Sequence, residues 1–376
     1  MLNGLARAFS VSLVTYEHPE AEVDIDAAEL SRLFPDVEMI VVPNQRADKR
    51  RAQACSLVSR RSWQWGRFAT PAYERALRAV VERRSIRLMH FDDLGVAASG
   101  PVAGTMGVFA PHNVEHRIIQ ASAATDTGVR AAFGEVEWRK IRREEQTAWQ
   151  RMSLCLAVSD VDASVMRRAG ARRVKLCPNG ADPVDRLDFP TRAQQEPLRL
   201  LFVGTASYRP YERGLAWFVS EVLPRLRETV PVELDVVGSP PLRPISAAGV
   251  RYHGRVPSLQ DFYGRAHAAL VPVFEGSGTR LKVIEAMAYG RPVVSTPLGS
   301  EGLPVRSPDH FLAASTVEQF TEVLENLARS TAGGDEGLAR MLERAHQAIR
   351  PLFWENIVAD LVELYRGELE REARRS

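Results

Sequence analysis

The sequence of 376 residues predicts two α/β domains, each built around a parallel sheet. Short apolar runs typical of buried strands alternate with amphipathic helical patterns. These runs form two series, divided at residues 182–197 by a segment with three prolines and mixed charge, which is typical of a linker. The length is sufficient for two domains of ordinary size, each with its own core.

The first series predicts strands at residues 11–15, 37–42, 86–91, 108–111, 154–159 and 174–177. Helical patterns lie between them at residues 27–33, 73–83, 135–152 and 161–168. Residues 1–9 predict a helix that precedes the first of these strands. The charge-dense stretch 135–151 predicts an exposed helix stabilised by pairs of opposite charge one turn apart.

The second series predicts strands at residues 199–203, 233–237, 250–253, 268–272 and 293–296, with helices at 214–229, 259–265 and 279–289. After Arg350 and Pro351 the chain enters a last helix that ends near Arg371. This helix either packs on the first domain or completes the second.

Composition excludes several classes of protein. A hydrophobic fraction of 45% and a charged fraction of 26% describe a soluble globular protein, and a net charge of +2 does not predict a nucleic-acid binder. No apolar run approaches the roughly 20 residues of a membrane span, and residues 1–7 lack the long apolar stretch of a signal peptide. Walker A, Gly-x-Gly-x-x-Gly, zincin and Cys-x-x-Cys motifs are absent. We expect a cytoplasmic protein, with peripheral contact to the inner membrane face as an open alternative.

The segment from Gly276 to Pro292 carries the strongest functional signal. Its glycines permit close approach of a ligand to the backbone, and a helix start attracts anionic oxygens. Arg280 and Lys282 add positive charge that suits a diphosphate. Glu285, about one turn later, can accept hydrogen bonds from a sugar diol or pair with Arg291 on the helix surface.

This segment resembles the nucleotide-sugar signature of the retaining glycosyltransferases of family 4. These enzymes have the GT-B fold, with two Rossmann-like α/β domains facing a cleft and a C-terminal helix that crosses back to the first domain. The resemblance implies a first domain at residues 1–187 completed by 352–376, a linker at 188–196 and a nucleotide-sugar domain at 197–351.

The same resemblance implies transfer of a hexose, with retention, from a nucleotide diphosphate sugar to a hydroxyl acceptor, which is a glycan, a glycolipid (lipid-linked) or a natural product. No cofactor or metal ion is implied, because cationic side chains replace magnesium. The catalytic residues implied are His112, Arg280 and Lys282. The donor-binding residues implied are Gly204, Thr205, Gly276, Ser277, Gly278, Thr279 and Glu285.

Three further blocks match the family in order. Residues 110–115 follow a strand and contain His112, which faces the donor in the family; a structural role is the alternative for a single histidine. Residues 178–182, Pro-Asn-Gly-Ala-Asp, match the block before the linker, although Asn-Gly after proline also forms a simple tight turn. Residues 201–205 open the second domain, and Gly204 lets the backbone approach the diphosphate.

The sequence also departs from the family. An arginine and a lysine expected after Gly204 have no counterpart, so Arg209, Arg213 or the Arg280 and Lys282 pair must supply that charge. Ser277 occupies the position of the first of the family's two glutamates, and Glu275 cannot be assumed equivalent. The backbone N–H groups of residues 276–278 can hold the sugar instead.

The amino terminus departs most. GT-B first domains normally begin with a strand and a glycine-rich loop before the first helix, and residues 1–9 already predict that helix. Either the start is truncated or the group does without these elements. A sheet that lacks the strand exposes unpaired backbone edges.

Two surface features leave alternatives open. The basic residues between Arg46 and Arg61, followed by Trp63 and Trp65, suit an anionic lipid or lipid-linked acceptor, or form a solvated face over two core tryptophans. Asp92 and Asp93 follow a strand and either bind acceptor hydroxyls or cap the next helix.

The alternative function is a catalytically weak GT-B scaffold that binds a nucleotide sugar or a partner without transfer. A GT-B epimerase or phosphorylase is disfavoured by the Pro-Asn-Gly-Ala-Asp block.

Overall fold

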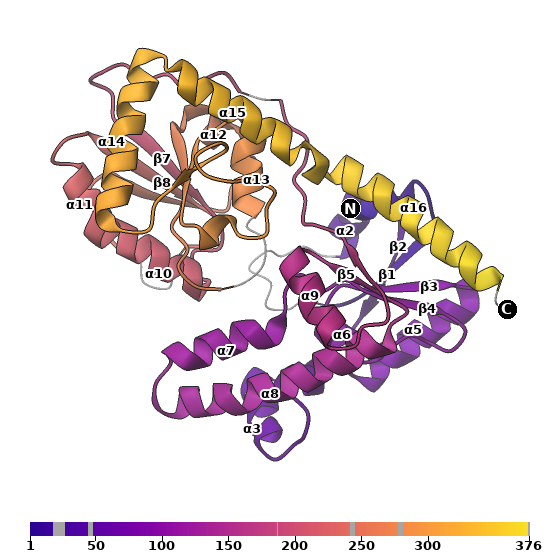
Figure 1. Cartoon of the computed structure of the whole chain (residues 1–376). Coiled ribbons are helices and arrows are strands. Elements are labelled where there is room, and N and C mark those ends of the chain that lie inside the picture. Colours follow the sequence, from indigo (N-terminus) through magenta and orange to yellow (C-terminus); the bar gives the residue numbers. More distant parts are fainter. Residues whose placement is uncertain (18–26, 44–47, 186, 241–244, 277–280, 375–376) are drawn as a thin grey trace. The chain divides into compact units, whose positions relative to one another are not determined.

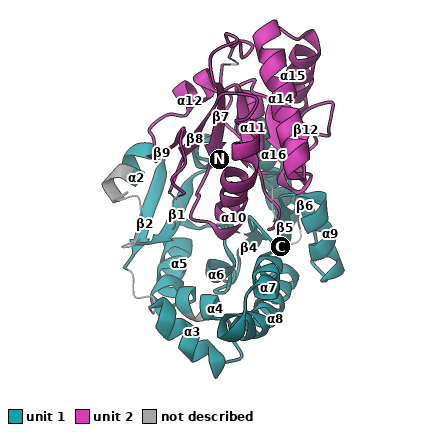
Figure 2. Cartoon of the chain, turned by 90° about the vertical axis from the view of Figure 1, so that its left-hand side faces the viewer, with its two compact units in different colours: residues 1–178, 355–376 teal, residues 179–354 magenta. Residues whose placement is uncertain are grey.

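The computed structural model describes residues 1–17, 27–43, 48–185, 187–240, 245–276 and 281–374. The chain divides into two compact units, residues 1–178 with 355–376 and residues 179–354 (Figure 2). Every strand pairing in the described residues is parallel, so each unit has the α/β architecture that the sequence predicts.

Unit 1 carries its strands in two described sheets. The strands are β1 (Val11–Tyr16), β2 (Val37–Val42), β3 (Leu88–Phe91), β4 (Met106–Phe109), β5 (Leu154–Ala157) and β6 (Val174–Leu176). One sheet holds β1 and β2, and the other has the order β3-β4-β5-β6. The helices are α1 (Leu2–Ala6), α2 (Ala27–Leu33), α3 (Lys49–Leu57), α4 (Trp63–Phe68), α5 (Pro71–Arg84), α6 (Leu94–Ala97), α7 (Glu115–Thr125), α8 (Gly128–Arg151) and α9 (Asp160–Arg168).

The last helix, α16 (Trp354–Ala373), packs almost entirely on unit 1 (Figure 1). Leu361 and Tyr365 lie in one apolar cluster with Val108 of β4 and Leu154 of β5. The Tyr365 hydroxyl lies 2.6 Å from His90 Nδ1. Arg173 pairs with Glu368, which is buried. The prediction that this helix returns to the first domain is confirmed.

Unit 2 is built on one sheet of order β12-β11-β10-β7-β8-β9. Its strands are β7 (Leu198–Val203), β8 (Val232–Val237), β9 (Val250–Gly254), β10 (Ala268–Val271), β11 (Val293–Ser295) and β12 (Leu312–Ala313). Its helical segments are α10 (Arg209–Trp217), η1 (Phe218–Val222), α11 (Leu223–Leu226), α12 (Gln260–Arg265), α13 (Leu281–Ala288), η2 (Leu298–Ser300), α14 (Val317–Gly333), α15 (Glu336–Ile349) and η3 (Arg350–Leu352). Apolar clusters cover both faces of this sheet, which is why its strands read as continuous apolar runs.

The expected linker at 188–196 belongs to unit 2. The backbone N–H of Arg192 donates to Thr331 O at 3.0 Å, and its guanidinium donates to Ala328 O at 2.9 Å. Phe189 packs against the unit 2 core. Prolines and mixed charge indicated a free segment, but these hydrogen bonds to α14 hold it on the surface of the unit.

The expectation that residues 135–151 form an exposed helix is wrong for one face of α8. Three carboxylates are buried on this face, those of Glu137, Glu144 and Glu145. The side chain of Lys140 is buried there as well. Glu144 accepts from Ser62 N at 2.8 Å, and Lys140 Nζ lies 2.8 Å from Glu137 Oε1. The charges face segments distant in sequence rather than solvent, so composition alone could not indicate their burial.

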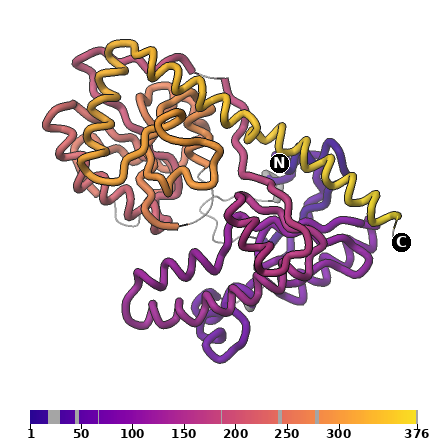
Figure 3. The backbone as a smooth tube through the Cα atoms, in the orientation of Figure 1, coloured from indigo at the N-terminus to yellow at the C-terminus, as the bar shows by residue number. Residues whose placement is uncertain are grey.

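The sequence assigned no helix to α3, α4, α7, α14 or α15. The pair α7 and α8 runs as adjacent coils in Figure 3. The two helices pack closely, because a Cβ added at Gly134 of α8 would lie 2.8 Å from Ala123 Cβ of α7. Trp63 and Trp65 are half-buried rather than core residues. Within the described residues, no helix combines the length and the apolar character needed to cross a bilayer.

Candidate functional site

Three neighbouring strands of unit 2 end in glycines with positive φ: Gly204 after β7 at 145°, Gly238 after β8 at 120° and Gly254 of β9 at 67°. A Cβ added at Gly238 would lie 2.2 Å from the Gly204 carbonyl oxygen. Side chains are therefore excluded where these backbones meet. The carboxyl ends of parallel strands are where α/β sheets bind ligands, so this bare edge is the candidate donor site.

Lys282 brings a buried positive charge to this edge from the first turn of α13. Its Nζ lies 3.4 Å from the Tyr211 ring centroid and 4.1 Å from that of Phe202, in cation–π contact. A Cβ added at Gly204 would be only 2.8 Å from the same Nζ. The structure thus brings Gly204 and Lys282, which the sequence analysis selected separately, into contact range.

Glu285 lies on the same helix and is half-buried. Burial raises the pKa of its carboxyl above the usual value, the Lys282 charge opposes that rise, and Asp182 adds to it. The alternative pairing with Arg291 is wrong. Arg291 is buried and donates from Nε to Tyr263 O and from Nη1 to Asp188 O, both at 2.8 Å.

Gly276 has a φ of 101°, which favours glycine. Glu275 before it pairs with Arg213 of α10, with 2.9 Å between Oε2 and Nη1. Thr205 is exposed beside Gly204. Ser277, Gly278, Thr279 and Arg280, which the sequence analysis assigned to this site, lie outside the described residues.

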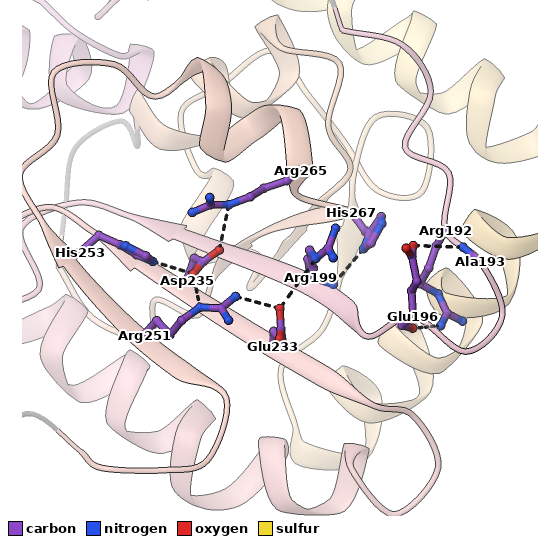
Figure 4. A network of polar contacts seen from close by, with 10 residues as sticks. All are labelled: Arg192, Ala193, Glu196, Arg199, Glu233, Asp235, Arg251, His253, Arg265 and His267. Atoms are coloured by element: carbon purple, nitrogen blue, oxygen red, sulfur yellow. Dashed lines mark hydrogen bonds and ion pairs between the residues drawn. The ribbon is translucent and has the colours of Figure 1, made fainter.

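A polar network centred on β8 and β9 escaped the sequence analysis (Figure 4). Buried Asp235 of β8 accepts from His253 at 2.6 Å and from Arg251 at 3.0 Å, and it pairs with Arg265 at 3.3 Å. Burial opposes ionisation, but the hydrogen bonds from His253 and Arg251 and the nearby arginine charges leave the pKa of Asp235 lowered. Through Asp235 the network links β8, β9 and α12.

In unit 1, His112 is exposed on the segment after β4. Asp92, just after β3, pairs with His90 at 2.9 Å. Burial would raise the pKa of Asp92, but the His90 hydrogen bond and the charges of His90 and His112 lower it. Asp93 caps α6 by accepting from Gly95 N at 2.6 Å, which supports the capping alternative for that residue.

Glu115 begins α7 close to these groups. Burial, followed by the charges of Asp93 and Glu145, raises the pKa of its carboxyl to about 7, against a small opposing effect of Gln64. Glu145 is buried and accepts from Glu115 N at 2.7 Å and from His116 Nδ1 at 2.5 Å. The sequence analysis missed Glu145 because it counted α8 as an exposed helix.

Residues 197–330 match the family model described as glycosyl transferases group 1, so unit 2 contains a domain of this family. A protein of Klebsiella pneumoniae described as an uncharacterized 44.6 kDa protein in the cps region is 27% identical over 150 residues, which cover 36% of this chain. The matched part spans 39% of the length of that relative. Assignment to family 4 stays a prediction.

Solved structures show the fold. Sucrose-phosphate synthase from Thermosynechococcus elongatus aligns with a TM-score of 0.71 at 16% identity, over 98% of this chain and 92% of its own. Anabaena HepE in complex with UDP-glucose aligns with a TM-score of 0.62 at 12% identity, over 95% of this chain and 99% of its own. A glycosyltransferase from Rickettsia africae aligns with a TM-score of 0.63 at 9% identity, over 96% of this chain and 98% of its own. The chain has the GT-B fold, as the resemblance implied.

The Glu115 environment predicts a pH-dependent stability. The folded-state pKa of about 7 lies above the reference value of 4.5, so the folded protein holds this proton more tightly and loses stability as pH rises through that window. Glu115→Gln stays uncharged. Urea unfolding should show the wild type losing up to about 3 kcal/mol relative to this variant between pH 5 and 8.

Glu82→Gln, at an exposed position on α5, is the matched control and should follow the wild type at both pH values. A constant difference between Glu115→Gln and the wild type across this range would contradict the assignment.

Proposed function

We propose that the chain is a retaining glycosyltransferase that moves a hexose from a nucleotide diphosphate sugar to a hydroxyl acceptor. The main support is the glycine edge of the unit 2 sheet, where Gly204 and Gly238 leave the backbone uncovered and the buried Lys282 lies beside it. This edge belongs to a domain that matches the glycosyl transferases group 1 model. The presence of UDP-glucose in the HepE structure supports a nucleotide-sugar donor for this fold.

Lys282 supplies the charge that the departing nucleoside diphosphate needs. Negative charge grows on the leaving oxygen as the sugar–phosphate bond breaks, and a fixed cation stabilises it without reorganisation. The packing of the side chain on Tyr211 and Phe202 holds the ammonium group in place. Arg280 adds a second charge in this proposal, and metal independence follows from the two cations.

Glu285 accepts the ribose hydroxyls, and Gly204, Thr205 and residues 276–279 take the diphosphate and sugar. For His112 we keep the role that the resemblance implies, donation of a hydrogen bond to the sugar. On the acceptor side, a Glu115 carboxyl that is partly protonated near pH 7 can donate to or accept from an incoming hydroxyl. Retention and the hexose are carried over from the resemblance.

A lipid-linked acceptor and peripheral contact with an anionic membrane surface form part of the proposal. Leu57 and Val58, at the end of α3, are 63% and 94% exposed. Arg61 lies 3.9 Å from the Trp65 ring centroid and Lys49 lies 5.6 Å from that of Trp63. Exposed apolar side chains among basic residues suit a headgroup layer.

Sedimentation with vesicles tests this contact. Vesicles containing anionic lipid should retain the wild type, and the variant Val58→Glu should bind at least about threefold less, because a carboxylate replaces an apolar contact and repels the surface. Val129→Glu, at another exposed apolar position in unit 1, is the control. Equal retention of both variants would remove the membrane contact from the proposal.

A catalytically weak scaffold remains the second candidate, because Glu275, the carboxylate closest to the family's first glutamate, is paired with Arg213. The protein is incubated with UDP-, GDP- and ADP-hexoses and a hydroxyl acceptor, and the release of nucleotide is measured. This measurement distinguishes a transferase from a scaffold. A transferase releases one nucleoside diphosphate in an acceptor-dependent manner. Binding without release across acceptors would favour the scaffold.

Lys282→Met keeps the apolar stem and removes the charge. It should weaken binding of the nucleoside diphosphate selected by the panel at least about tenfold, since a charged hydrogen bond contributes about 1.5–3 kcal/mol. Binding of the nucleoside alone should change little. Calorimetry measures both, with Lys175→Met at an exposed lysine as control. Equal losses for both ligands would mean that Lys282 does not contact the diphosphate.

Glu285→Gln should raise the donor dissociation constant at least about tenfold, because a carboxylate accepts two ribose hydroxyls better than an amide does. The 2′-deoxy nucleotide should lose less affinity in this variant than the ribonucleotide. Glu322→Gln, exposed on α14, should bind as the wild type does. Unchanged ribonucleotide affinity in Glu285→Gln would show that the ribose lies elsewhere.

A further inference from the structure

Helix α10 packs directly on the segment that continues from β10 toward the donor site. A Cβ added at Gly214 would overlap the carbonyl oxygen of Pro272, so the helix backbone touches this segment. Trp217, one turn later, meets the Phe274 ring edge to face, with 4.7 Å between the ring centroids. Residues 272–274 are therefore held against one face of α10.

Arg213 of the same helix adds an ion pair to the next residue of this segment. Its Nη1 lies 2.9 Å from Glu275 Oε2, and its side chain is 55% exposed. An exposed ion pair adds little to folding stability, so its main effect is on where Glu275 lies. Gly276, the first residue of the signature segment, follows with a φ of 101°. Arg213 thus fixes the last residue before that segment.

Tyr211 provides a further contact between α10 and the donor site. The Lys282 Nζ lies 3.4 Å from the centroid of the Tyr211 ring. The Phe202 ring meets the Tyr211 ring edge to face, with 6.1 Å between the centroids. Since Tyr211, Gly214 and Trp217 are three residues apart, they share one face of the helix. This face of α10 therefore contacts both the segment after β10 and the buried cation.

We propose that α10 is the positioning element of the donor site. Tyr211 orients the Lys282 ammonium group. Arg213 orients Glu275 and thereby the start of the signature segment. The inference rests on the proposed function, because it takes the diphosphate to lie beside Lys282. Arg213, one of the cations that the sequence offers for the diphosphate, then acts on the protein and not on the ligand.

The contacts suit this task for physical reasons. A lysine side chain is long and flexible, and fixing it before the ligand arrives reduces the entropic cost of binding. An aromatic face attracts the ammonium group and leaves N–H donors on the other side for a ligand. Gly276 permits more backbone conformations than other residues do, so a restraint on Glu275 defines the path of the chain.

A double-mutant cycle distinguishes positioning by Arg213 from contact with the diphosphate. Calorimetry measures the affinity for the nucleoside diphosphate at an ionic strength of about 0.3 M, which screens charges that are not in contact. Arg213→Gln should weaken binding at least about threefold in the wild type and less than about 1.5-fold in Glu275→Gln, where its partner is already absent. Equal losses in both backgrounds would place Arg213 on the ligand and overturn the proposal.

Arg225→Gln is the matched control, because Arg225 is also 55% exposed and pairs with Glu318 at 2.7 Å in the same unit. It should bind as the wild type does, and a loss equal to that of Arg213→Gln would overturn the proposal. Without ligand, amides of residues 273–276 should exchange at least about threefold faster in Arg213→Gln than in Arg225→Gln. Equal exchange would contradict the fixing of this segment by Arg213.

The reactivity of lysine side chains toward an acetylating ester tests Tyr211. The chain has four lysines, at positions 49, 140, 175 and 282, so mass spectrometry follows each of them separately. Tyr211→Leu keeps an apolar side chain but no ring, and Lys282 should react at least about fivefold faster in this variant. Tyr211→Phe keeps the ring and should preserve the slow rate of the wild type.

Lys140 is the internal control for a general loss of structure, because it is buried and pairs with Glu137 in unit 1. Rates of Lys282 are therefore expressed relative to the rate of Lys140. An unchanged ratio in Tyr211→Leu, or an equal rise in Tyr211→Phe, would overturn the role of the Tyr211 ring.

The two measurements without ligand separate this inference from the proposed function. If no nucleoside diphosphate of the UDP, GDP and ADP panel bound the wild type, the proposed function would fail, while exchange and acetylation would still test α10. Tyr211→Leu should weaken binding of the selected nucleoside diphosphate at least about threefold. If the wild type and Tyr211→Leu bound it equally well, the proposed function would stand and positioning by α10 would be wrong.

Discussion

A parallel sheet must be covered by apolar side chains on both faces, and the way each unit meets this requirement governs the rest of the structure. In unit 1 the second face is covered by α1 and α16, the first and last helices described. Leu361 and Tyr365 occupy the position that an internal helix would otherwise fill. The chain therefore has to leave unit 2 and return, and the ion pair between Arg173 and buried Glu368 stabilises the far end of α16.

The polar groups of the unit 2 sheet form two sets. Asp235, inside β8, pairs with Arg251, His253 and Arg265, so opposite charges neutralise each other within the protein. At the carboxyl ends, Gly204 and Gly238 expose backbone, and Lys282 brings its charge beside them. This end thus combines exposed backbone with a buried cation, which suits a diphosphate.

Buried carboxylates organise the irregular parts of unit 1. Glu144 accepts from Ser62 and Glu137 accepts from Trp63 N at 3.0 Å, so α8 anchors the start of α4. Glu145 accepts from the first N–H groups of α7. A negative charge near a helix start is favourable, but it also raises the pKa of the neighbouring Glu115. Glu145 thus anchors α7 and, after burial and the charge of Asp93, also contributes to the raised pKa of Glu115.

The sequence by itself determined the features that depend on local pattern. Apolar runs between turn residues located most strands, and the resemblance of two short motifs to a known family assigned Gly204, Lys282 and Glu285 to one site. Tertiary structure decided what depends on distant partners. It buried one face of α8, directed Arg291 to the carbonyls of Tyr263 and Asp188, and fixed residues 188–196 on α14. The sequence does not tell whether the partner of a charged or polar residue is water or a backbone group far along the chain. Only the packing of the folded chain decides which partner it has.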